Sequence, residues 1–294
     1  MTLPTVAFVG LGRMGEPMVA NLRKGDLPVR VFDASADLAR QVAQRHGATA
    51  CGDWAELARG ADIVVTMLPN GAVVREVLLN AQGGLARQLA RGTVVVDMSS
   101  SEPMGTRELG RELAALGLAL VDAPVSGGVP GAAAGTLSIM AGGEADAIDR
   151  AMPAFLTMGK RVFRTGGPGS GHATKALNNF VAASAYAATA EAVLIGQRFG
   201  LEEAQLVEII NASTGRSFNS EIVFAGQVVP RKFATGFAMS LMAKDVAIAS
   251  ELGRAVGADA PLSHLVSQRW DTALQTLGGD VDQSRALLAW GVRP

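Results

Sequence analysis

A glycine-rich hexapeptide near the N-terminus has the spacing G-x-G-x-x-G. Its members are Gly10, Leu11, Gly12, Arg13, Met14 and Gly15. An apolar run (residues 6–9) precedes it and a helical pattern follows, the context in which the glycines permit a tight turn, a close approach to a pyrophosphate and helix packing. The free N–H groups of the helix N-terminus would then face the phosphates. The segment predicts a dinucleotide-binding loop; a glycine turn that serves another ligand is the alternative.

An acidic residue follows where a ribose-binding acid belongs. Asp33 ends the second apolar run, 18 residues after Gly15. Its carboxylate would accept hydrogen bonds from the ribose hydroxyls and would repel a 2′-phosphate. Ala34 and Ser35 supply no arginine to receive that phosphate. We therefore predict NAD in preference to NADP as the cofactor.

Two further strand ends carry polar residues. Leu68, Pro69 and Asn70 follow one apolar run, and residues 99–101, all serine, follow another. Ligands of open parallel sheets bind beyond the carboxyl ends of the strands. Ordinary turns use the same residue types, so both interpretations stay open on this local pattern.

The segment D-A-P-V-S-G-G follows the next apolar run. Ser126, Gly127 and Gly128 combine a hydroxyl group with consecutive backbone N–H groups. Such a nest suits a carboxylate, which makes it a candidate for binding an acidic substrate. A flexible connection is the alternative.

A lysine stands at the start of an alanine-rich helical stretch. Lys175 and Asn179 are four residues apart and share one helix face. Partial desolvation makes a lysine easier to deprotonate, and therefore a usable acid or base near neutral pH. A solvated lysine with a polar neighbour is the alternative. His172 is either a second acid or base, or a helix-capping residue.

A second charged pair lies in apolar surroundings further along the chain. It consists of Lys244 and Asp245, within F-A-M-S-L-M-A-K-D. The pattern fits either a structural ion pair or a lysine directed at the cofactor.

Short apolar runs alternating with helical patterns must position these residues. We predict strands at residues 6–9, 29–33, 63–68, 93–97, 118–122, 136–141 and 161–164, and a loop at 127–131. Helices are expected between most of them, and the combination predicts a parallel sheet covered on both faces. After residue 165 we expect only helices, at 172–199, 202–211, 239–256, 261–277 and 282–290. The predicted domains are therefore residues 1–165 and 166–294.

Composition limits the classes of function. The chain has 294 residues, 26 Lys and Arg against 27 Asp and Glu, and one cysteine. This balance argues against a nucleic-acid binder with a broad basic surface, and one cysteine allows neither an internal disulfide nor a zinc cluster. No apolar run reaches the roughly 18 residues of a membrane helix, and no signal-peptide pattern opens the chain. We expect a cytoplasmic protein without membrane or nucleic-acid partners.

Taken together, these motifs resemble the β-hydroxyacid dehydrogenase family, over residues 6 to about 290. The D-A-P-V-S-G-G, G-x-G-x-x-x-K-x-x-N-N and L-M-x-K-D segments are specific to it as a set. The resemblance implies an α/β fold with an N-terminal Rossmann domain and an all-α C-terminal domain joined by a long helix. It also implies NAD or NADP without a metal, and a homodimer or homotetramer.

The resemblance also assigns roles to residues. Lys175 would be the catalytic acid or base, and Asn179 would position substrate beside it. Ser126, Gly127 and Gly128 would hold the substrate carboxylate. The remaining implied residues would contact or approach the cofactor; they are Leu68, Pro69, Ser100 and Lys244.

The implied substrate is a small hydroxy acid or its semialdehyde. The segment G-T-L-S-I-M (135–140) is similar to tartronate semialdehyde reductases, whereas N-A-S-T-G-R-S (211–217) and L-M-A-K-D (241–245) are more similar to 3-hydroxyisobutyrate dehydrogenases. Selectivity for one methylene group is worth only about 1–3 kcal/mol, so several acids stay open. Two other classes are a noncatalytic dinucleotide-binding module, which would not need Lys175, and an interaction protein, which would not bind NADH.

Overall fold

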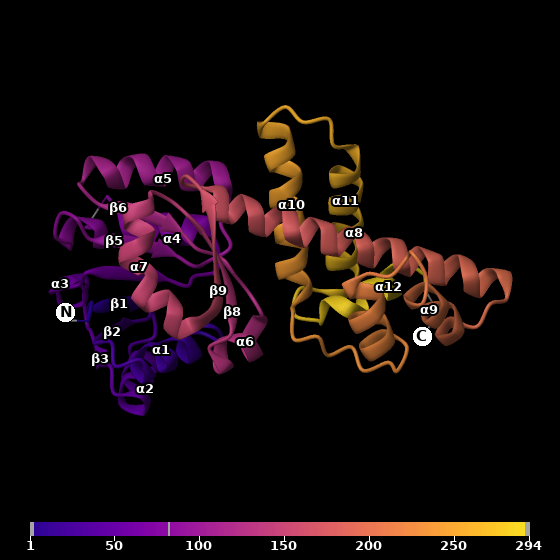
Figure 1. Ribbon diagram of the computed structural model, residues 1–294, viewed down its shortest axis with the longest axis horizontal. Helices are drawn as coiled ribbons and strands as arrows, with labels where there is room; N and C mark the ends of the chain where they lie inside the picture. The colour runs from indigo at the N-terminus through magenta and orange to yellow at the C-terminus, as the bar shows by residue number, and fades with distance from the viewer. Residues whose placement is uncertain (1–2, 82, 292–294) are drawn as a thin grey trace. The chain divides into compact units, whose positions relative to one another are not determined.

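The computed structural model describes residues 3–81 and 83–291. The chain divides into two compact units, Met1–Lys175 and Ala176–Pro294. The first is α/β and the second is helical (Figure 1). The division lies inside a 30-residue helix, α8 (Ser170–Phe199).

A largely parallel sheet forms the centre of the first unit. Its strands are β1 (Val6–Val9), β2 (Val29–Phe32), β3 (Thr49–Ala50), β4 (Ile63–Thr66), β5 (Val94–Asp97), β6 (Ala119–Asp122), β7 (Val125–Ser126), β8 (Leu137–Gly142) and β9 (Gly159–Gly166). Their order begins β3-β2-β1-β4-β5-β6, all parallel, as in a dinucleotide-binding sheet. The carboxyl ends of β1, β2, β4 and β5 therefore meet at one edge.

Helices cover both faces of this sheet. They are α1 (Gly15–Lys24), α2 (Ala36–His46), α3 (Trp54–Ala58), α4 (Gly71–Leu79), a 3-10 turn (Leu85–Gln88), α5 (Pro103–Ala115), α6 (Gly128–Ala134) and α7 (Ala145–Met158). Side chains alternate between two cores: Val6 and Phe8 pack with α1 and α7, whereas Ala7 and Val9 pack with α3, α4 and α5. A strand with two covered faces must be apolar at every position, which explains the unbroken apolar runs.

One edge of the sheet differs from the expected parallel arrangement. β8 pairs antiparallel with both β6 and β7, and β9 then pairs parallel with β8. The expected loop at residues 127–131 is also wrong, because α6 begins at Gly128. Gly127 and Gly128, with φ of 131° and 59°, let the chain turn from β7 into this helix.

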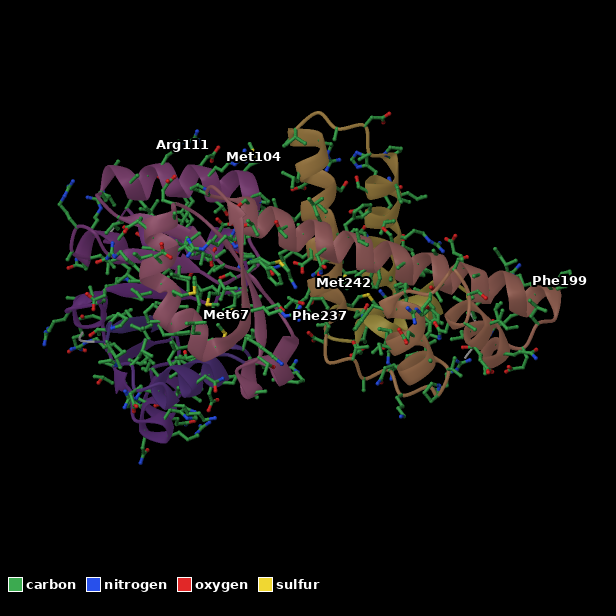
Figure 2. The ribbon with its side chains drawn as sticks, viewed as in Figure 1. Met67, Met104, Arg111, Phe199, Phe237 and Met242 are labelled. Atoms are coloured by element: carbon green, nitrogen blue, oxygen red, sulfur yellow. The ribbon has the colours of Figure 1, made fainter. Side chains whose placement is uncertain are left out.

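The second unit is built from helices around an aromatic core. Besides the later part of α8 it contains α9 (Glu203–Asn211), α10 (Met239–Ala255), α11 (Pro261–Leu277), a 3-10 turn (Gln283–Arg285) and α12 (Ala286–Ala289). Tyr186 and Trp270 are fully buried and lie 5.4 Å apart between ring centroids. Met242 also belongs to this core, and the partly buried Phe237 packs against it; both are labelled in Figure 2.

Two features of this unit depart from the expected helices. A π-helix occupies Asn219–Val228, where no regular element was expected. The last expected helix, 282–290, is divided into the 3-10 turn and α12.

Helix α8 is also long and apolar enough to cross a membrane, by length and composition alone. The core helix of a folded domain meets the same criterion. Ala183, Tyr186 and Val193 of α8 are fully buried in the core of the second unit, which accounts for their apolar character.

Candidate active site

The glycine loop connects β1 to α1 with the geometry that a dinucleotide needs. Gly10 has φ of 95°, and a Cβ there would lie 2.4 Å from the Met67 carbonyl oxygen. A Cβ on Gly15 would lie 1.9 Å from the Gly10 carbonyl oxygen. A Cβ on Gly12 would meet nothing within 4 Å, so the backbone there borders open space. The first and third glycines thus serve the turn, whereas the second leaves room for a ligand.

Asp33 lies directly beside this loop. Its Oδ2 accepts a hydrogen bond from the Leu11 N–H at 2.8 Å, and its Oδ1 accepts one from the Ser35 N–H at 2.9 Å. A carboxylate has about four lone-pair sites, so both oxygens retain acceptor capacity for hydroxyl groups. The side chain is only partly buried. The loop and this acid therefore fit the pyrophosphate and ribose of a dinucleotide.

The serine segment after β5 is held by a buried aspartate that the sequence analysis did not single out. Asp97 Oδ1 accepts hydrogen bonds from Thr66 Oγ1 and the Ser99 N–H, and Oδ2 accepts one from Ser101 Oγ. Ser99 Oγ in turn accepts a hydrogen bond from the Leu68 N–H at 2.9 Å. The loops after β4 and β5 are therefore tied together, which brings two of the expected cofactor-contacting segments side by side. An aspartate at the end of an all-apolar strand was the available signal.

Ser126, Gly127 and Gly128 lie at the turn from β7 into α6. Ser126 is half-buried and pairs with Ser138 of β8, whereas both glycines are exposed. Their backbone groups can therefore be reached from solvent, as a carboxylate nest requires.

Lys175 and Asn179 occur on α8, one turn apart. Asn179 is buried and donates a hydrogen bond from Nδ2 to Asp245 Oδ2 at 2.6 Å. Lys244 Nζ lies 3.8 Å from the other oxygen of Asp245. Within the second unit, Asp245 thus fixes the amide of Asn179 and pairs with Lys244. This link between two expected site residues was not apparent from the sequence.

His172 lies in the first turn of α8 and is 1% exposed. Its ring nitrogens contact Thr106 Oγ1 at 2.8 Å and the Ser99 carbonyl oxygen at 3.1 Å. The Asp122 carboxylate accepts a hydrogen bond from the His172 backbone N–H. The histidine is thus a buried structural contact of the helix start, and Asp122 caps the backbone.

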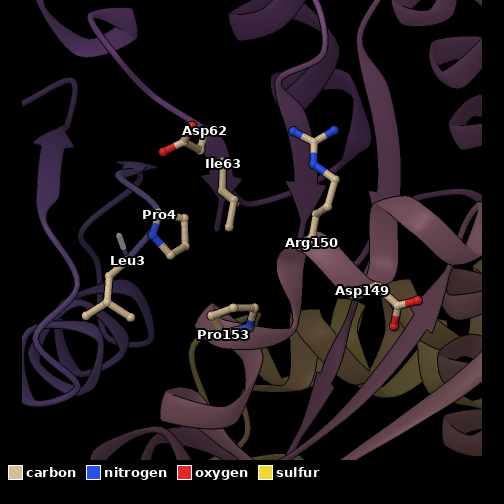
Figure 3. A pocket seen from close by; sticks show the side chains of 7 residues that line it. All are labelled: Leu3, Pro4, Asp62, Ile63, Asp149, Arg150 and Pro153. Carbon is tan, nitrogen blue, oxygen red and sulfur yellow. The ribbon is translucent and has the colours of Figure 1, made fainter. Parts of the chain in front are cut away.

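A cavity of about 290 Å³ lies elsewhere on the first unit (Figure 3). Pro4, Asp62 and Ile63 line it near the amino ends of β1 and β4, together with Asp149 and Arg150 of α7. The residues expected to bind cofactor lie at the carboxyl ends of the strands, so this cavity is separate from them. In the part of the chain that the structure describes, no group of three or more His, Cys, Asp and Glu side chains is placed to hold a metal ion.

The sheet order, the glycine loop and Asp33 define a dinucleotide-binding protein of the Rossmann class. The protein-family model for the NAD-binding domain of 6-phosphogluconate dehydrogenase matches residues 5–167. A second protein-family model, described as NAD-binding of NADP-dependent 3-hydroxyisobutyrate dehydrogenase, matches residues 169–290.

Individual proteins resemble the chain over nearly its whole length. It is 37% identical to 2-(hydroxymethyl)glutarate dehydrogenase of Eubacterium barkeri, over 97% of this chain and 94% of that protein. It is 38% identical to the NAD-dependent L-serine dehydrogenase of Pseudomonas aeruginosa, over 88% and 89%. The structure of Mycobacterium tuberculosis 3-hydroxyisobutyrate dehydrogenase with L-serine aligns at a TM-score of 0.90 and 32% identity, covering 99% of this chain and 100% of that one. The chain belongs to the β-hydroxyacid dehydrogenase family and is an NAD(P)-dependent hydroxyacid dehydrogenase.

Proposed function

We propose that this enzyme oxidises the primary alcohol of a 2-substituted 3-hydroxypropanoate, HOCH₂–CHR–COO⁻, to the semialdehyde, with NAD as the preferred cofactor. Three of the substrates that the relatives' names give share this unit: R is methyl in 3-hydroxyisobutyrate, an ammonium group in L-serine and carboxyethyl in 2-(hydroxymethyl)glutarate. Glycerate, the reduced form of tartronate semialdehyde, has R as hydroxyl. The observation that carries the proposal is the partly buried Lys175 in the second turn of α8. The first turn of this helix is hydrogen-bonded through His172 to Asp122 and to Ser99.

Lys175 is assigned as the acid and base. When bound, the nicotinamide supplies the acceptor or donor of hydride. In oxidation the neutral Lys175 amine removes the proton from the substrate hydroxyl; in reduction the ammonium returns that proton to the forming alcohol.

Two groups of residues position the substrate in this proposal. Ser126, Gly127 and Gly128 bind the carboxylate through a hydroxyl and backbone N–H groups. Asn179 holds the substrate beside Lys175, and its hydrogen bond to Asp245 keeps the amide in one orientation.

The cofactor contacts are assigned to the glycine loop and four further residues. Residues 10–15, Asp33, Leu68, Pro69 and Ser100 contact it, and Lys244 is assigned a place near it. The Asp33 carboxylate favours NAD because a 2′-phosphate would be repelled.

The two parts of the chain are assigned different tasks. Residues 1–165 form the dinucleotide-binding domain, which also carries the residues assigned to the substrate carboxylate. Residues 166–294 supply further substrate contacts and the contacts of a homodimer or homotetramer. The enzyme acts in the cytoplasm on a small-molecule acid.

A substrate panel tests the proposal. Formation of NADH or NADPH is measured with 3-hydroxyisobutyrate, L-serine, glycerate and 2-(hydroxymethyl)glutarate, and with 4-hydroxybutyrate as the control whose alcohol lies one carbon further from the carboxylate. We expect the highest kcat/KM with one of the first four acids and with NAD. A preference for 4-hydroxybutyrate over all four would contradict the assigned substrate class.

The role of Lys175 is tested by Lys175→Met. The kcat should fall by at least about 10²-fold, the scale of one general acid or base, while the NADH dissociation constant stays unchanged. Lys160→Met, at an exposed position of β9, is the matched control and should keep full turnover. Normal turnover of Lys175→Met would refute the assignment.

A further inference from the structure

Three buried ionisable groups lie where α8 meets the sheet, and the proposed chemistry uses none of them. Asp97 and Asp122 end β5 and β6 and are 1% and 0% exposed; His172 is 1% exposed. Buried charges are costly unless they are paired or hydrogen-bonded. Three such groups in one place therefore indicate that they hold neighbouring segments in position.

Asp122 caps α8 from a distant part of the chain. Its Oδ1 accepts a hydrogen bond from the Gly169 N–H at 2.7 Å, and its Oδ2 accepts one from the His172 N–H at 2.8 Å. The first four N–H groups of a helix lack partners within the helix, so this carboxylate satisfies two backbone donors at its start. Burial raises the pKa of Asp122. The nearby His172 and the two N–H groups lower this pKa, but by less than burial raises it.

The start of α8 is also in close contact with the strands. A Cβ on Gly171 would lie 2.3 Å from the Met140 carbonyl oxygen and 2.5 Å from that of Asp122. A Cβ on Gly142 would lie 2.7 Å from the Gly171 backbone nitrogen. Because no side chain separates these backbones, the first turn of α8 lies directly against β6 and β8.

The His172 ring extends the same contact to β5 and α5. Since a carbonyl oxygen only accepts, Nε2 carries a proton and donates to the Ser99 carbonyl at 3.1 Å. Nδ1 lies 2.8 Å from Thr106 Oγ1. Asp97 Oδ2 is 3.7 Å from Nε2, and Asp122 Oδ2 is 3.8 Å from Nδ1, so a carboxylate faces each side of the ring.

We propose that His172, held between Asp97 and Asp122, is a positioning residue that sets the direction of Lys175 relative to the serine loop after β5. Lys175 lies three residues after His172 on the same helix, so a rotation of the first turn moves it directly. The inference rests on the proposed role of Lys175. The same cluster includes Asp122, four residues before Ser126, and contacts Ser99, which adjoins Ser100. It therefore joins three segments, each of which carries at least one residue assigned to the active site.

The size of the effect follows from the geometry required for proton transfer. A displacement of about 1 Å between reacting groups can cost up to about 10²-fold in rate. Loss of the His172 ring removes its two hydrogen bonds but leaves the Asp122 cap and the glycine contacts. We therefore expect a change in the direction of Lys175 without loss of the fold.

The test uses three variants of the full chain. His172→Leu removes both ring hydrogen bonds. His172→Gln places an amide near the position of Nε2 and can still donate to the Ser99 carbonyl, whereas the shorter His172→Asn can reach only Thr106. We expect kcat to fall at least about tenfold for Leu, less for Asn, and to stay within about threefold of wild type for Gln. The NADH dissociation constant and the substrate KM should change by less than about threefold.

Two controls separate positioning from general destabilisation and from failure of the proposed function. Phe155→Leu changes a fully buried core residue of α7 and should lower the melting temperature but keep kcat. Lys175→Met reports on the proposed acid and base in the same assay. If Lys175→Met abolishes turnover but His172→Leu reacts at the wild-type rate, the positioning role is wrong. The role is also wrong if Phe155→Leu loses kcat to the same extent as the His172 variants for the same loss of melting temperature.

Discussion

Two glycines of the same loop should respond to alanine in opposite ways. Gly12→Ala adds a methyl group where nothing lies within 4 Å, so the fold should accept it. That open space is where we expect the pyrophosphate, so the methyl group should obstruct the cofactor. Gly15→Ala adds a methyl group 1.9 Å from the Gly10 carbonyl oxygen, so the loop or α1 must move.

The magnitudes follow from these distances. A carbon atom needs about 3.4 Å from its neighbours, so the Gly15 substitution requires a displacement of more than about 1 Å. Overpacking costs about 1–3 kcal/mol, and this contact belongs at the upper end. For a domain of this size about 3 kcal/mol corresponds to roughly 6–12 °C in melting temperature. For Gly12→Ala we expect a change within about 2 °C but an NADH dissociation constant at least about tenfold higher, or about 1.4 kcal/mol.

Thermal unfolding without cofactor and NADH fluorescence titration together measure both effects. Gly253→Ala, in α10, is the matched control, because its added Cβ would make only ordinary contacts at 3.9 Å. It should leave NADH binding unchanged and keep or slightly raise the melting temperature, since alanine favours helix over glycine. The reasoning is refuted if Gly12→Ala binds NADH as tightly as wild type, or if Gly15→Ala melts at the wild-type temperature.

Two further outcomes follow from single side chains. Asp33→Asn removes the charge that repels a 2′-phosphate, so the ratio of kcat/KM with NAD to that with NADP should fall at least about tenfold. Asp146→Asn, at an exposed position of α7, should not change this ratio. An unchanged ratio in Asp33→Asn would exclude the charge as the cause of the cofactor preference. Burial raises the pKa of the Cys51 thiol. The contribution of this thiol to the free energy of unfolding is therefore complete below the pKa of the unfolded state and is lost as the pH rises through the pKa of the folded state. In the native protein this single cysteine should react slowly with a disulfide reagent near pH 8 and rapidly after denaturation, whereas equal rates would contradict the burial argument.

Much of the first unit could be predicted because its signals are local. Val6–Val9, the glycine loop and α1 are consecutive, and each glycine acts within a few residues of its own position. The end of α2 at His46 was predictable too, since Gly47 adopts the left-handed conformation that follows a helix. Asp33 could be placed beside the loop because the β1–β2 crossover has little freedom in length.

Other elements could not be predicted, because their stability depends on partners distant in the chain. The antiparallel β8 has the same apolar pattern as a parallel strand, and only its pairing with β6 and β7 decides its direction. The short helix α6 is rich in glycine and includes a proline, so its local pattern favours a loop. The π-helix at Asn219–Val228 also has no pattern that distinguishes it from an irregular segment.

The sequence by itself determined the class of cofactor site and the candidate acid and base, since G-x-G-x-x-G, Asp33 and Lys175 each carry their chemistry in residue type and spacing. Only the tertiary structure showed what holds them in place. Asp97, Asp122 and His172 are separated by 25 and 50 positions in the chain, yet they meet because β5 and β6 are neighbours and α8 starts at their carboxyl ends. The physical reason is that hydrogen bonds between distant residues depend on sheet order and helix packing, which are properties of the whole chain.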